Sequence, residues 1–238
     1  LSQALQAQGL RILAFPTIQI SPAASANASE RLSRQLAQTD IVLFVSRNAV
    51  DQAFVVCAPA TWPESIRFGV IGKGTRDALL EYGLQPEINP QHSFNSEGLL
   101  QAPALQQVKG LRILILRGQE GRNLLGDTLQ QRGAQVRYLE VYRRHLPVYR
   151  DNYFADLTRA EFPDIAVFTS AEGLRNCFQL IDAASAPQLL QIPWVLISDR
   201  MGETAADLGH NADIIVAPEA SDEGITKALQ NWRKNFIK

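Results

Sequence analysis

The chain has 238 residues, of which 46% are hydrophobic and 20% are charged, and its formal net charge is −1. These values are typical of a globular protein with one or two domains, and the near-zero charge argues against broad nucleic-acid binding, which needs a basic excess. No apolar run approaches the roughly 20 residues of a membrane-spanning helix, and no signal peptide is evident. We therefore expect a cytoplasmic protein that binds neither nucleic acid nor membrane, although clustered arginines could still bind a small anion.

Short apolar runs rich in Val and Ile alternate with amphipathic stretches along the whole chain. Runs of this kind are typical of strands buried on both faces, and they lie at residues 10–15, 41–45, 68–71, 113–116, 136–141, 165–168, 194–197 and 214–216. Helices are predicted between them, at residues 1–8, 29–38, 47–57, 75–82, 97–108, 121–132, 171–182, 201–208 and 221–236. This alternation predicts an α/β fold with parallel sheets.

Several of these helices carry recognisable boundary residues. Serine side chains often cap helix N-termini, and we predict that role for Ser46, Ser96, Ser170 and Ser221. Glycine adopts the left-handed conformation that ends many helices, and we predict that role for Gly9, Gly83, Gly133 and Gly209.

The chain also contains an internal sequence repeat. The segment Phe-Val-Ser46-Arg-Asn-Ala-Val is similar to Phe-Thr-Ser170-Ala-Glu-Gly-Leu, which lies 124 residues later. Gly9 and Gly133 are separated by the same 124 residues. A repeat this long is a duplicated half-domain, because solenoid repeats run to only about 20–50 residues. The sequence predicts two similar flavodoxin-like parallel-sheet lobes joined by a two-stranded β connector.

The repeat also predicts how the lobes share the chain. Residues 25–138 form one continuous lobe, residues 1–14 and 150–238 form a discontinuous lobe, and residues 15–24 and 139–149 are the connectors. Residues 22–27 suit a surface linker. The strand at 112–117 has its counterpart before residue 1, so we expect the discontinuous lobe to lack its first strand in this sequence. A small-molecule site is expected between two such lobes, and lobe closure is a plausible motion.

Two strand ends open directly onto helices. They carry Ser46-Arg47 and Ser170-Ala171, and the exposed amides of a helix N-terminus favour anions at this edge of a parallel sheet. The alternative is that both serines are simple caps. A third strand end, Gly72-Lys73-Gly74-Thr75, lets a ligand approach the backbone, or is a plain tight turn. It is not a dinucleotide fingerprint, because Asp77 stands where the third glycine would be.

Two single side chains complete the candidate site. Arg117 ends a buried strand and could bind a carboxylate through both of its terminal nitrogens, or it could be a surface ion-pair residue. Tyr142 lies at the start of the second connector, where its phenol could donate a proton to a leaving group, or it could be a packed aromatic.

Other catalytic groups find no support in the sequence. Cys57 and Cys177 lie in apolar helical contexts, so we expect buried free thiols. The three histidines are far apart, show no metal-ligand spacing, and are expected to face solvent. A site in this chain would have to work without a metal or a covalent nucleophile.

Taken together and in order, these motifs resemble the uroporphyrinogen-III synthase family, and the similarity covers essentially the whole chain. The segments that carry it are Phe-Pro16-Thr-Ile-Gln-Ile, Asp40-Ile-Val-Leu-Phe-Val-Ser46-Arg-Asn-Ala-Val, Val-Ile-Gly72-Lys-Gly-Thr75, Ser96-Glu-Gly-Leu-Leu, Ile-Leu-Ile-Leu-Arg117-Gly, Val-Tyr142-Arg-Arg, Asp164-Ile-Ala-Val-Phe-Thr-Ser170 and Asp222-Glu-Gly-Ile. The resemblance implies a cofactor-free lyase of heme biosynthesis. It would cyclise hydroxymethylbilane with loss of water and inversion of ring D, and no metal is implied.

The resemblance also assigns roles to individual residues. Tyr142 matches the family's connector tyrosine, which we expect to assist departure of the hydroxyl group. Thr75 matches a cleft threonine, and Met201 stands at its counterpart, where many relatives have threonine, so any role of Met201 must be backbone-mediated. The amides after Ser46, Ser170 and Gly72 are expected to hold the acetate and propionate groups.

Two other classes of function and two partner questions stay open at this point. The chain could be a catalytically silent two-lobed tetrapyrrole-binding or sensor module, or, less in keeping with its motifs, a flavin or nucleotide enzyme. The expected partner is hydroxymethylbilane, with transient contact with hydroxymethylbilane synthase as a further expectation. We expect a monomer, because nothing in the sequence demands an oligomer.

Overall fold

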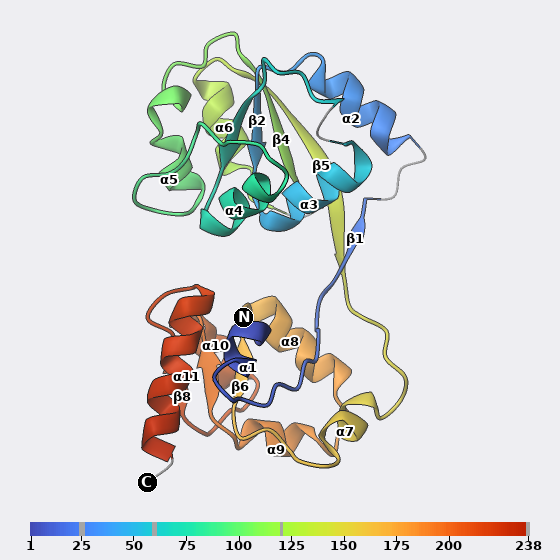
Figure 1. The fold of residues 1–238 in the computed structure, drawn as a ribbon, viewed down its shortest axis with the longest axis vertical. Coiled ribbons are helices and arrows are strands. Elements are labelled where there is room, and N and C mark those ends of the chain that lie inside the picture. Colours follow the sequence, from blue (N-terminus) through green and yellow to red (C-terminus); the bar gives the residue numbers. More distant parts are fainter. Residues whose placement is uncertain (24–26, 59–60, 120, 237–238) are drawn as a thin grey trace. The chain divides into compact units, whose positions relative to one another are not determined.

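A computed structural model describes residues 1–23, 27–58, 61–119 and 121–236 (Figure 1). Half of the predicted linker at 22–27, namely residues 24–26, lies outside these ranges. The chain divides into two compact units, which we describe separately: unit 1 comprises Leu1–Gln19 and Leu146–Lys238, and unit 2 comprises Ile20–His145. The assignment of separate connector segments stays a prediction.

Unit 2 is built on a five-stranded sheet whose strand order is β1-β5-β4-β2-β3. The strands are β1 (Gln19–Pro22), β2 (Ile41–Phe44), β3 (Arg67–Val70), β4 (Arg112–Gly118) and β5 (Gln135–His145). The pairs β2–β3, β2–β4 and β4–β5 are parallel. Every residue of β2 is buried, as expected for a central strand covered on both faces.

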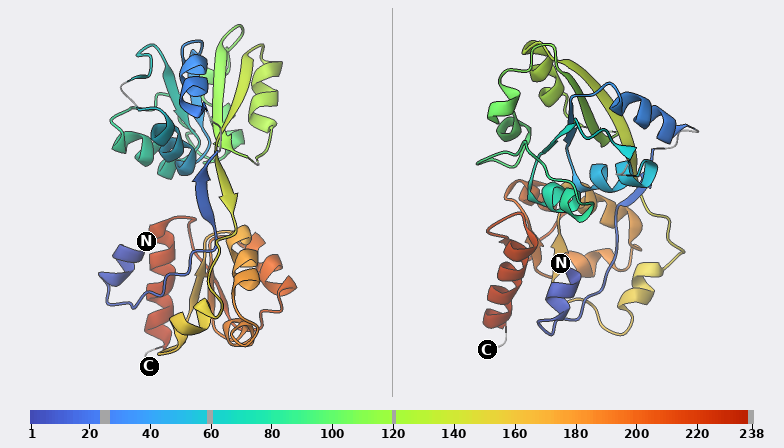
Figure 2. Two further views of the ribbon diagram at one scale, coloured as in Figure 1. Left: turned by 90° about the vertical axis from the view of Figure 1, so that its right-hand side faces the viewer. Right: turned by 45° about the horizontal axis from the view of Figure 1, so that its top comes forward.

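Helices cover both faces of this sheet (Figure 2). They are α2 (Ala28–Leu36), α3 (Arg47–Val56), α4 (Lys73–Glu81), α5 (Ser96–Leu100) and α6 (Leu124–Gln131). Because side chains alternate along a strand, Val42 and Phe44 join the core that includes α2, α3 and α4, whereas Ile41 and Leu43 join the core that includes α5 and α6.

The edge strand β1 is tied to the far end of β5. The Ala23 amide donates to the Val141 carbonyl at 3.0 Å, and Ser21 Oγ lies 2.6 Å from His145 Nε2. These contacts extend the sheet past the point where β4 ends.

Unit 1 contains a three-stranded parallel sheet in the order β6-β7-β8. Its strands are β6 (Ala166–Phe168), β7 (Trp194–Leu196) and β8 (Ile214–Val216), and its helices are α1 (Ser2–Gln6), α7 (Tyr153–Thr158), α8 (Ala171–Leu180), α9 (Ala186–Leu190), α10 (Arg200–Asp207) and α11 (Asp222–Phe236). Trp194 and Leu196 pack with α8 and α10 on one face, and Val195 packs with α1 and α11 on the other.

The α/β class with parallel sheets is confirmed, and so are most of the boundary residues. Ser46, Ser170 and Ser221 each accept a hydrogen bond from an amide three residues later. Left-handed φ angles of 75–87° occur at all four predicted glycines, Gly9, Gly83, Gly133 and Gly209. None of the helices in the described ranges has the length and apolar character needed to span a lipid bilayer.

The predicted strand at residues 10–15 is wrong. A strand needs a partner strand for its backbone hydrogen bonds, and no strand of the described part of unit 1 is hydrogen-bonded to this segment in a sheet. Its side chains pack instead: Leu10 and Ile12 join the core around Leu5, and the Phe15 ring stacks on Tyr149 with centroids 5.1 Å apart.

The predicted helix at 97–108 is interrupted, and its predicted cap is wrong. Helix α5 ends at Leu100, and Pro103 opens a separate 3₁₀ turn, Pro103–Leu105, because proline lacks the amide that would continue the first helix. The cap of α5 is Asn95, whose Oδ1 accepts from the Gly98 amide at 2.8 Å, while Ser96 is the first helical residue.

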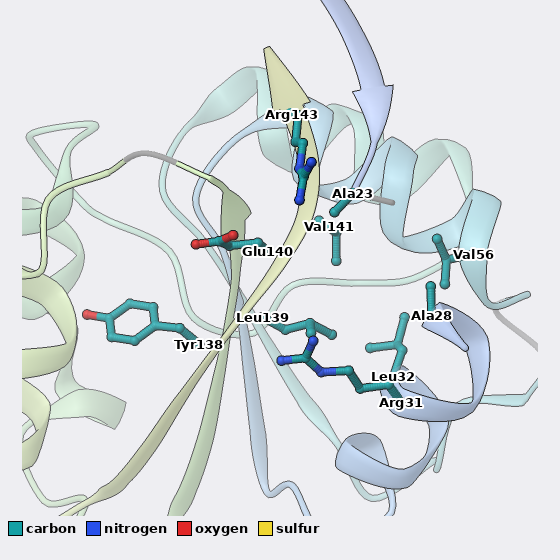
Figure 3. A pocket seen from close by; sticks show the side chains of 10 residues that line it. All are labelled: Ala23, Ala28, Arg31, Leu32, Val56, Tyr138, Leu139, Glu140, Val141 and Arg143. Atoms are coloured by element: carbon teal, nitrogen blue, oxygen red, sulfur yellow. The ribbon is translucent and has the colours of Figure 1, made fainter. Parts of the chain in front are cut away.

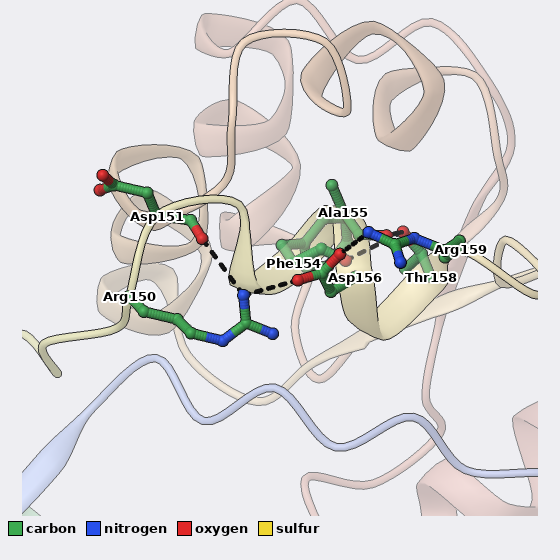
Figure 4. A network of polar contacts seen from close by, with 7 residues as sticks. All are labelled: Arg150, Asp151, Phe154, Ala155, Asp156, Thr158 and Arg159. Atoms are coloured by element: carbon green, nitrogen blue, oxygen red, sulfur yellow. Dashed lines mark hydrogen bonds and ion pairs between the residues drawn. The ribbon is translucent and has the colours of Figure 1, made fainter.

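The helices α7 and α9 were not predicted, since each is too short to show a periodic pattern. Around α7 a charged network helps to fix the chain (Figure 4). Asp156 accepts hydrogen bonds from Arg150 and Arg159, and the bond from Arg150 is the largest cause that lowers the pKa of Asp156. Ion pairs between exposed side chains stabilise a fold only weakly.

A second carboxylate, that of Asp40, ties the start of β2 to β4. Asp40 accepts from the backbone amide of Arg112 at 2.8 Å and from Nε and Nη2 of its guanidinium at 3.1 and 2.6 Å. These bonds, the side-chain ones first, lower the pKa of Asp40.

We expect Asp40→Asn to cause a small decrease in the free energy of unfolding at neutral pH, because solvent screens this half-exposed pair. The pKa of Asp40 is lower in the folded state, so its stabilisation is present above the unfolded value of about 3.9 and is lost as the pH falls further. Urea unfolding over a pH series would measure the difference between wild type and variant. Asp164→Asn is a matched control, because no hydrogen bond or ion pair engages Asp164 in the described structure. A difference that stays constant down to acidic pH would contradict the prediction.

Candidate functional site

The parallel strands of unit 2 end at one edge of the sheet and bring four predicted segments to it. Ser46 follows β2, Gly72 follows β3, and Arg117 lies near the end of β4. Tyr142 on β5 pairs with Gly118 across a register shift in the β4–β5 ladder. This edge is where open parallel sheets place their ligands.

A hydroxyl pair lies at the centre of this edge. Tyr142 OH is 3.2 Å from Ser46 Oγ, and the same Oγ accepts from the Ala49 amide at 3.1 Å. The Tyr142 side chain is only 4% exposed and packs in the core with Phe44 and Val70. Tyr142 is therefore a packed aromatic whose phenol oxygen is fixed beside the N-terminus of α3.

Gly118 makes room for the Tyr142 ring, and sequence reasoning missed it. A Cβ at position 118 would lie 2.7 Å from two ring carbons of Tyr142. The only signal in the sequence is that a glycine ends a strand whose centre is apolar. The tyrosine orientation therefore depends on a residue 24 positions earlier in the chain that has no side chain of its own.

The segment Gly72–Thr75 forms the N-terminus of α4, which begins at Lys73, two residues earlier than predicted. Gly72 provides no side-chain cap, and a Cβ at Gly74 would meet no atom within 4 Å. The Thr75 side chain is buried. A ligand could therefore reach the backbone of this turn more readily than the Thr75 hydroxyl. The Phe94 side chain, which is 66% exposed, lies beside Gly72.

Two of the predicted cationic residues already have partners in the protein. Arg47 Nη2 lies 2.5 Å from Glu81 Oε2, and its Nε lies 3.5 Å from Asp51. The hydrogen bond to Glu81 is the main cause that raises the pKa of Arg47. A carboxylate ligand would have to compete with Glu81 for this guanidinium.

Arg117 is held within its own loop. Its Nη1 donates to Asn123 Oδ1 at 3.0 Å, and its guanidinium carbon lies 4.1 Å from the centre of the Tyr138 ring. Both partners are neutral, so Arg117 keeps its positive charge at this edge, and its Nε is buried without an acceptor in the described structure. The helix N-termini add partial positive charge there.

In unit 1 the predicted residues lie at the ends of β6 and β7. Ser170 Oγ accepts from the Gly173 amide at 2.9 Å, which leaves Ala171 as the first residue of α8. Met201 is 4% exposed and packs with Leu174 and Trp194. The thioether is a core group, so a ligand could be contacted at this position only through the backbone.

Both cysteines and one of the histidines are buried at least in part. Both cysteines are free and buried, as predicted, and burial raises the pKa of Cys177 to about 12, so its thiol stays protonated. The prediction that all histidines face solvent is wrong for His210. It is partly buried against the Trp194 ring at 3.8 Å, and its Nε2 lies 3.0 Å from the Ile192 carbonyl oxygen.

We expect Gly118→Ala to lower the free energy of unfolding by about 1–3 kcal/mol, the usual cost of overpacking a core. The added methyl would displace the Tyr142 ring. Urea unfolding followed by tyrosine and tryptophan fluorescence would measure the loss. The control is Gly74→Ala, which has open space around it and should leave stability unchanged or raise it, since alanine favours helix. Equal stabilities of the two variants would contradict the packing role of Gly118.

Comparison with known proteins gives consistent matches over the whole length. The family model described as "Uroporphyrinogen-III synthase HemD" matches residues 1–227. The uroporphyrinogen-III synthase of Escherichia coli K12 is 34% identical over 224 residues, covering 91% of this chain and 89% of that protein. The Salmonella typhimurium LT2 enzyme of the same name is 34% identical over 242 residues, covering 95% and 93%. The crystal structure of uroporphyrinogen-III synthetase from Helicobacter pylori 26695 shares the fold, with a TM-score of 0.63 at 14% identity and 91% coverage of both chains.

Proposed function

Because this chain belongs to the uroporphyrinogen-III synthase family, we propose that it converts hydroxymethylbilane to uroporphyrinogen III. The observation that carries this proposal is the family match over residues 1–227. The reaction makes the protein a cyclising lyase of heme biosynthesis. No observation favours the alternative of a catalytically silent binding module.

The proposed reaction has three steps. Loss of water from the hydroxymethyl end of the linear tetrapyrrole gives an electrophilic azafulvene. The already substituted carbon of the terminal ring attacks it and forms a spiro intermediate, which then fragments and recombines so that the ring is inverted. The protein's main task is to hold a flexible chain so that the congested carbon attacks first, which is catalysis by orientation.

We assign departure of the hydroxyl group to Tyr142. A phenol can donate its proton to the leaving oxygen as water departs. Ser46 Oγ accepts from the Ala49 amide at 3.1 Å, so the hydroxyl hydrogen of Ser46 can point to the Tyr142 oxygen 3.2 Å away. In that arrangement the phenol keeps its own hydrogen free, and Ser46 stabilises the negative charge that develops as the proton leaves. Ser46 is then a positioning residue for Tyr142.

The carboxylates of the substrate are proposed to bind mainly backbone amides. The N-termini of α3 and α4 carry partial positive charge, and the space beside Gly74 supports close approach of a ligand to the main chain. The proposed substrate contacts in unit 2 are Ser46, Arg47, Gly72, Lys73, Gly74, Thr75 and Arg117. In unit 1 they are Ser170, Ala171 and the backbone of Met201.

We also propose that the two units arose by duplication, with residues 15–24 and 139–149 as connectors. Two observations support the duplication. The first is the strand order: β2, β3 and the isolated parallel bridge between Gly69 and Ile88 follow one another as β6, β7 and β8 do. The second is that Ser46 and Ser170 cap their helices in the same way. A monomeric state, a cytoplasmic location and transient contact with hydroxymethylbilane synthase stay predictions.

The direct test is the isomer composition of the product. Hydroxymethylbilane would be generated in situ, the protein added, and the oxidised products separated into type I and type III isomers. We expect type III in the presence of the protein and type I in its absence. Type I product alone from a folded, full-length protein would rule out the proposed function.

For Tyr142→Phe we expect turnover to fall by roughly ten- to a hundred-fold, within the range of general acid catalysis. The substitution keeps the buried ring and removes only the hydroxyl, so KM and stability should change little. Initial rates of type III formation would measure the effect. An unchanged turnover number would remove Tyr142 from the proton transfer.

Ser46→Ala should lower turnover as well as removing a helix cap worth about 1 kcal/mol of stability. Asn95→Ala is the matched control, because it also removes a helix cap in unit 2 but lies outside the proposed site. We expect similar losses of stability in both variants and a loss of turnover only in Ser46→Ala, with rescue in Ser46→Thr, which retains a hydroxyl. Equal turnover in Ser46→Ala and Asn95→Ala would mean that Ser46 only caps its helix and does not position Tyr142.

A further inference from the structure

A pocket of about 280 Å³ lies in unit 2 between helix α2 and strand β5, and the proposed substrate contacts do not line it. Part of its wall is apolar, formed by Leu32, Val56, Leu139 and Val141. Figure 3 shows the guanidinium groups of Arg31, from α2, and Arg143, from β5, extending into the space between the two elements. The pocket thus combines an apolar surface with two positive charges.

Neither guanidinium has a partner in the described structure. Arg31 and Arg143 make no side-chain hydrogen bond or ion pair there, and Arg143 Nε is buried without any acceptor. A buried donor without an acceptor is costly and calls for an explanation, such as an ion or ligand that accepts from it.

The nearest acidic side chain does not supply that acceptor. Glu140 also contributes to the pocket wall, but its carboxylate extends away from Arg31 and Arg143 in Figure 3. Arg137, also on β5, donates to Gln38 at 3.4 Å. Within the described part of the chain, no carboxylate is therefore paired with Arg31 or Arg143.

We propose that this pocket binds a small organic anion with carboxylate groups on an apolar body. Guanidinium groups match carboxylates in bidentate geometry, and the two arginines can hold two such groups. The Leu and Val side chains favour a hydrocarbon or aromatic body over a bare inorganic ion, which would leave this apolar surface in water. The inference stands on the contacts of unit 2 alone and does not depend on the proposed enzymatic activity.

The test is a titration of the full-length ¹⁵N-labelled protein with phthalate, an aromatic dicarboxylate, observed through the arginine Nε–Hε resonances. We expect a saturable shift of the Arg143 resonance that weakens as salt is added. Arg31→Gln and Arg143→Gln should each raise the dissociation constant about ten-fold or more, since a charged hydrogen bond contributes that much. In Arg143→Gln the shifts of the other pocket resonances report binding.

The matched control is Arg34→Gln, which removes a positive charge from the same helix at a residue that does not line the pocket. It should bind phthalate like the wild type. Inorganic phosphate, titrated in parallel, should bind more weakly. Urea unfolding of each variant establishes that it is folded, and Arg31→Gln, an exposed position on a helix, supplies the test if Arg143→Gln does not fold.

Three results would overturn the proposal. The first is the absence of a saturable shift in the wild type. The second is phthalate binding that survives both Arg31→Gln and Arg143→Gln, or that Arg34→Gln weakens as strongly. The third is phosphate binding as tight as phthalate binding, which would remove the apolar body from the description of the ligand.

Discussion

The in-register parallel pairing of β2 with both β3 and β4 is the constraint on which the candidate site of unit 2 depends. Phe44 stands opposite Val70 in one ladder and opposite Leu116 in the other. Because all three strands run the same way, the residues that follow them emerge at one edge. A shift of register by one residue would turn every β2 side chain to the other face, and both cores of the unit oppose it.

The chemistry at that edge relies on space and hydrogen bonding more than on free charge. The Tyr142 hydroxyl lies next to the helix-capping Ser46, and the Tyr142 ring fills the space that Gly118 leaves because it has no Cβ. Arg47 is paired with the Glu81 carboxylate, and Arg117 is held by the neutral amide of Asn123. Backbone amides at helix N-termini are then the natural groups for a substrate rich in carboxylates, since they favour anions without bringing a counter-ion of their own.

The arginines of the pocket between α2 and β5 differ from those at the strand ends. There two guanidinium groups have no partner among the described residues, although the same strand contributes Glu140, because the Glu140 carboxylate extends away from them (Figure 3). The two regions differ in that Arg47 and Arg117 at the strand ends each donate at least one side-chain hydrogen bond, whereas Arg31 and Arg143 donate none in the described structure.

The amino-acid sequence by itself determined what depends on neighbours along the chain. Buried runs such as Ile41–Phe44, the caps Ser46 and Ser170, and the left-handed glycines follow from local sterics and hydrogen bonding. The order of the motifs also identified the family. Only the tertiary structure decided which distant groups meet: that residues 10–15 form no strand, that Glu81 engages Arg47, that Met201 is packed in a core, and that Tyr142 OH lies beside Ser46 Oγ. Those outcomes depend on contacts between segments far apart in the chain, and no local periodicity records them.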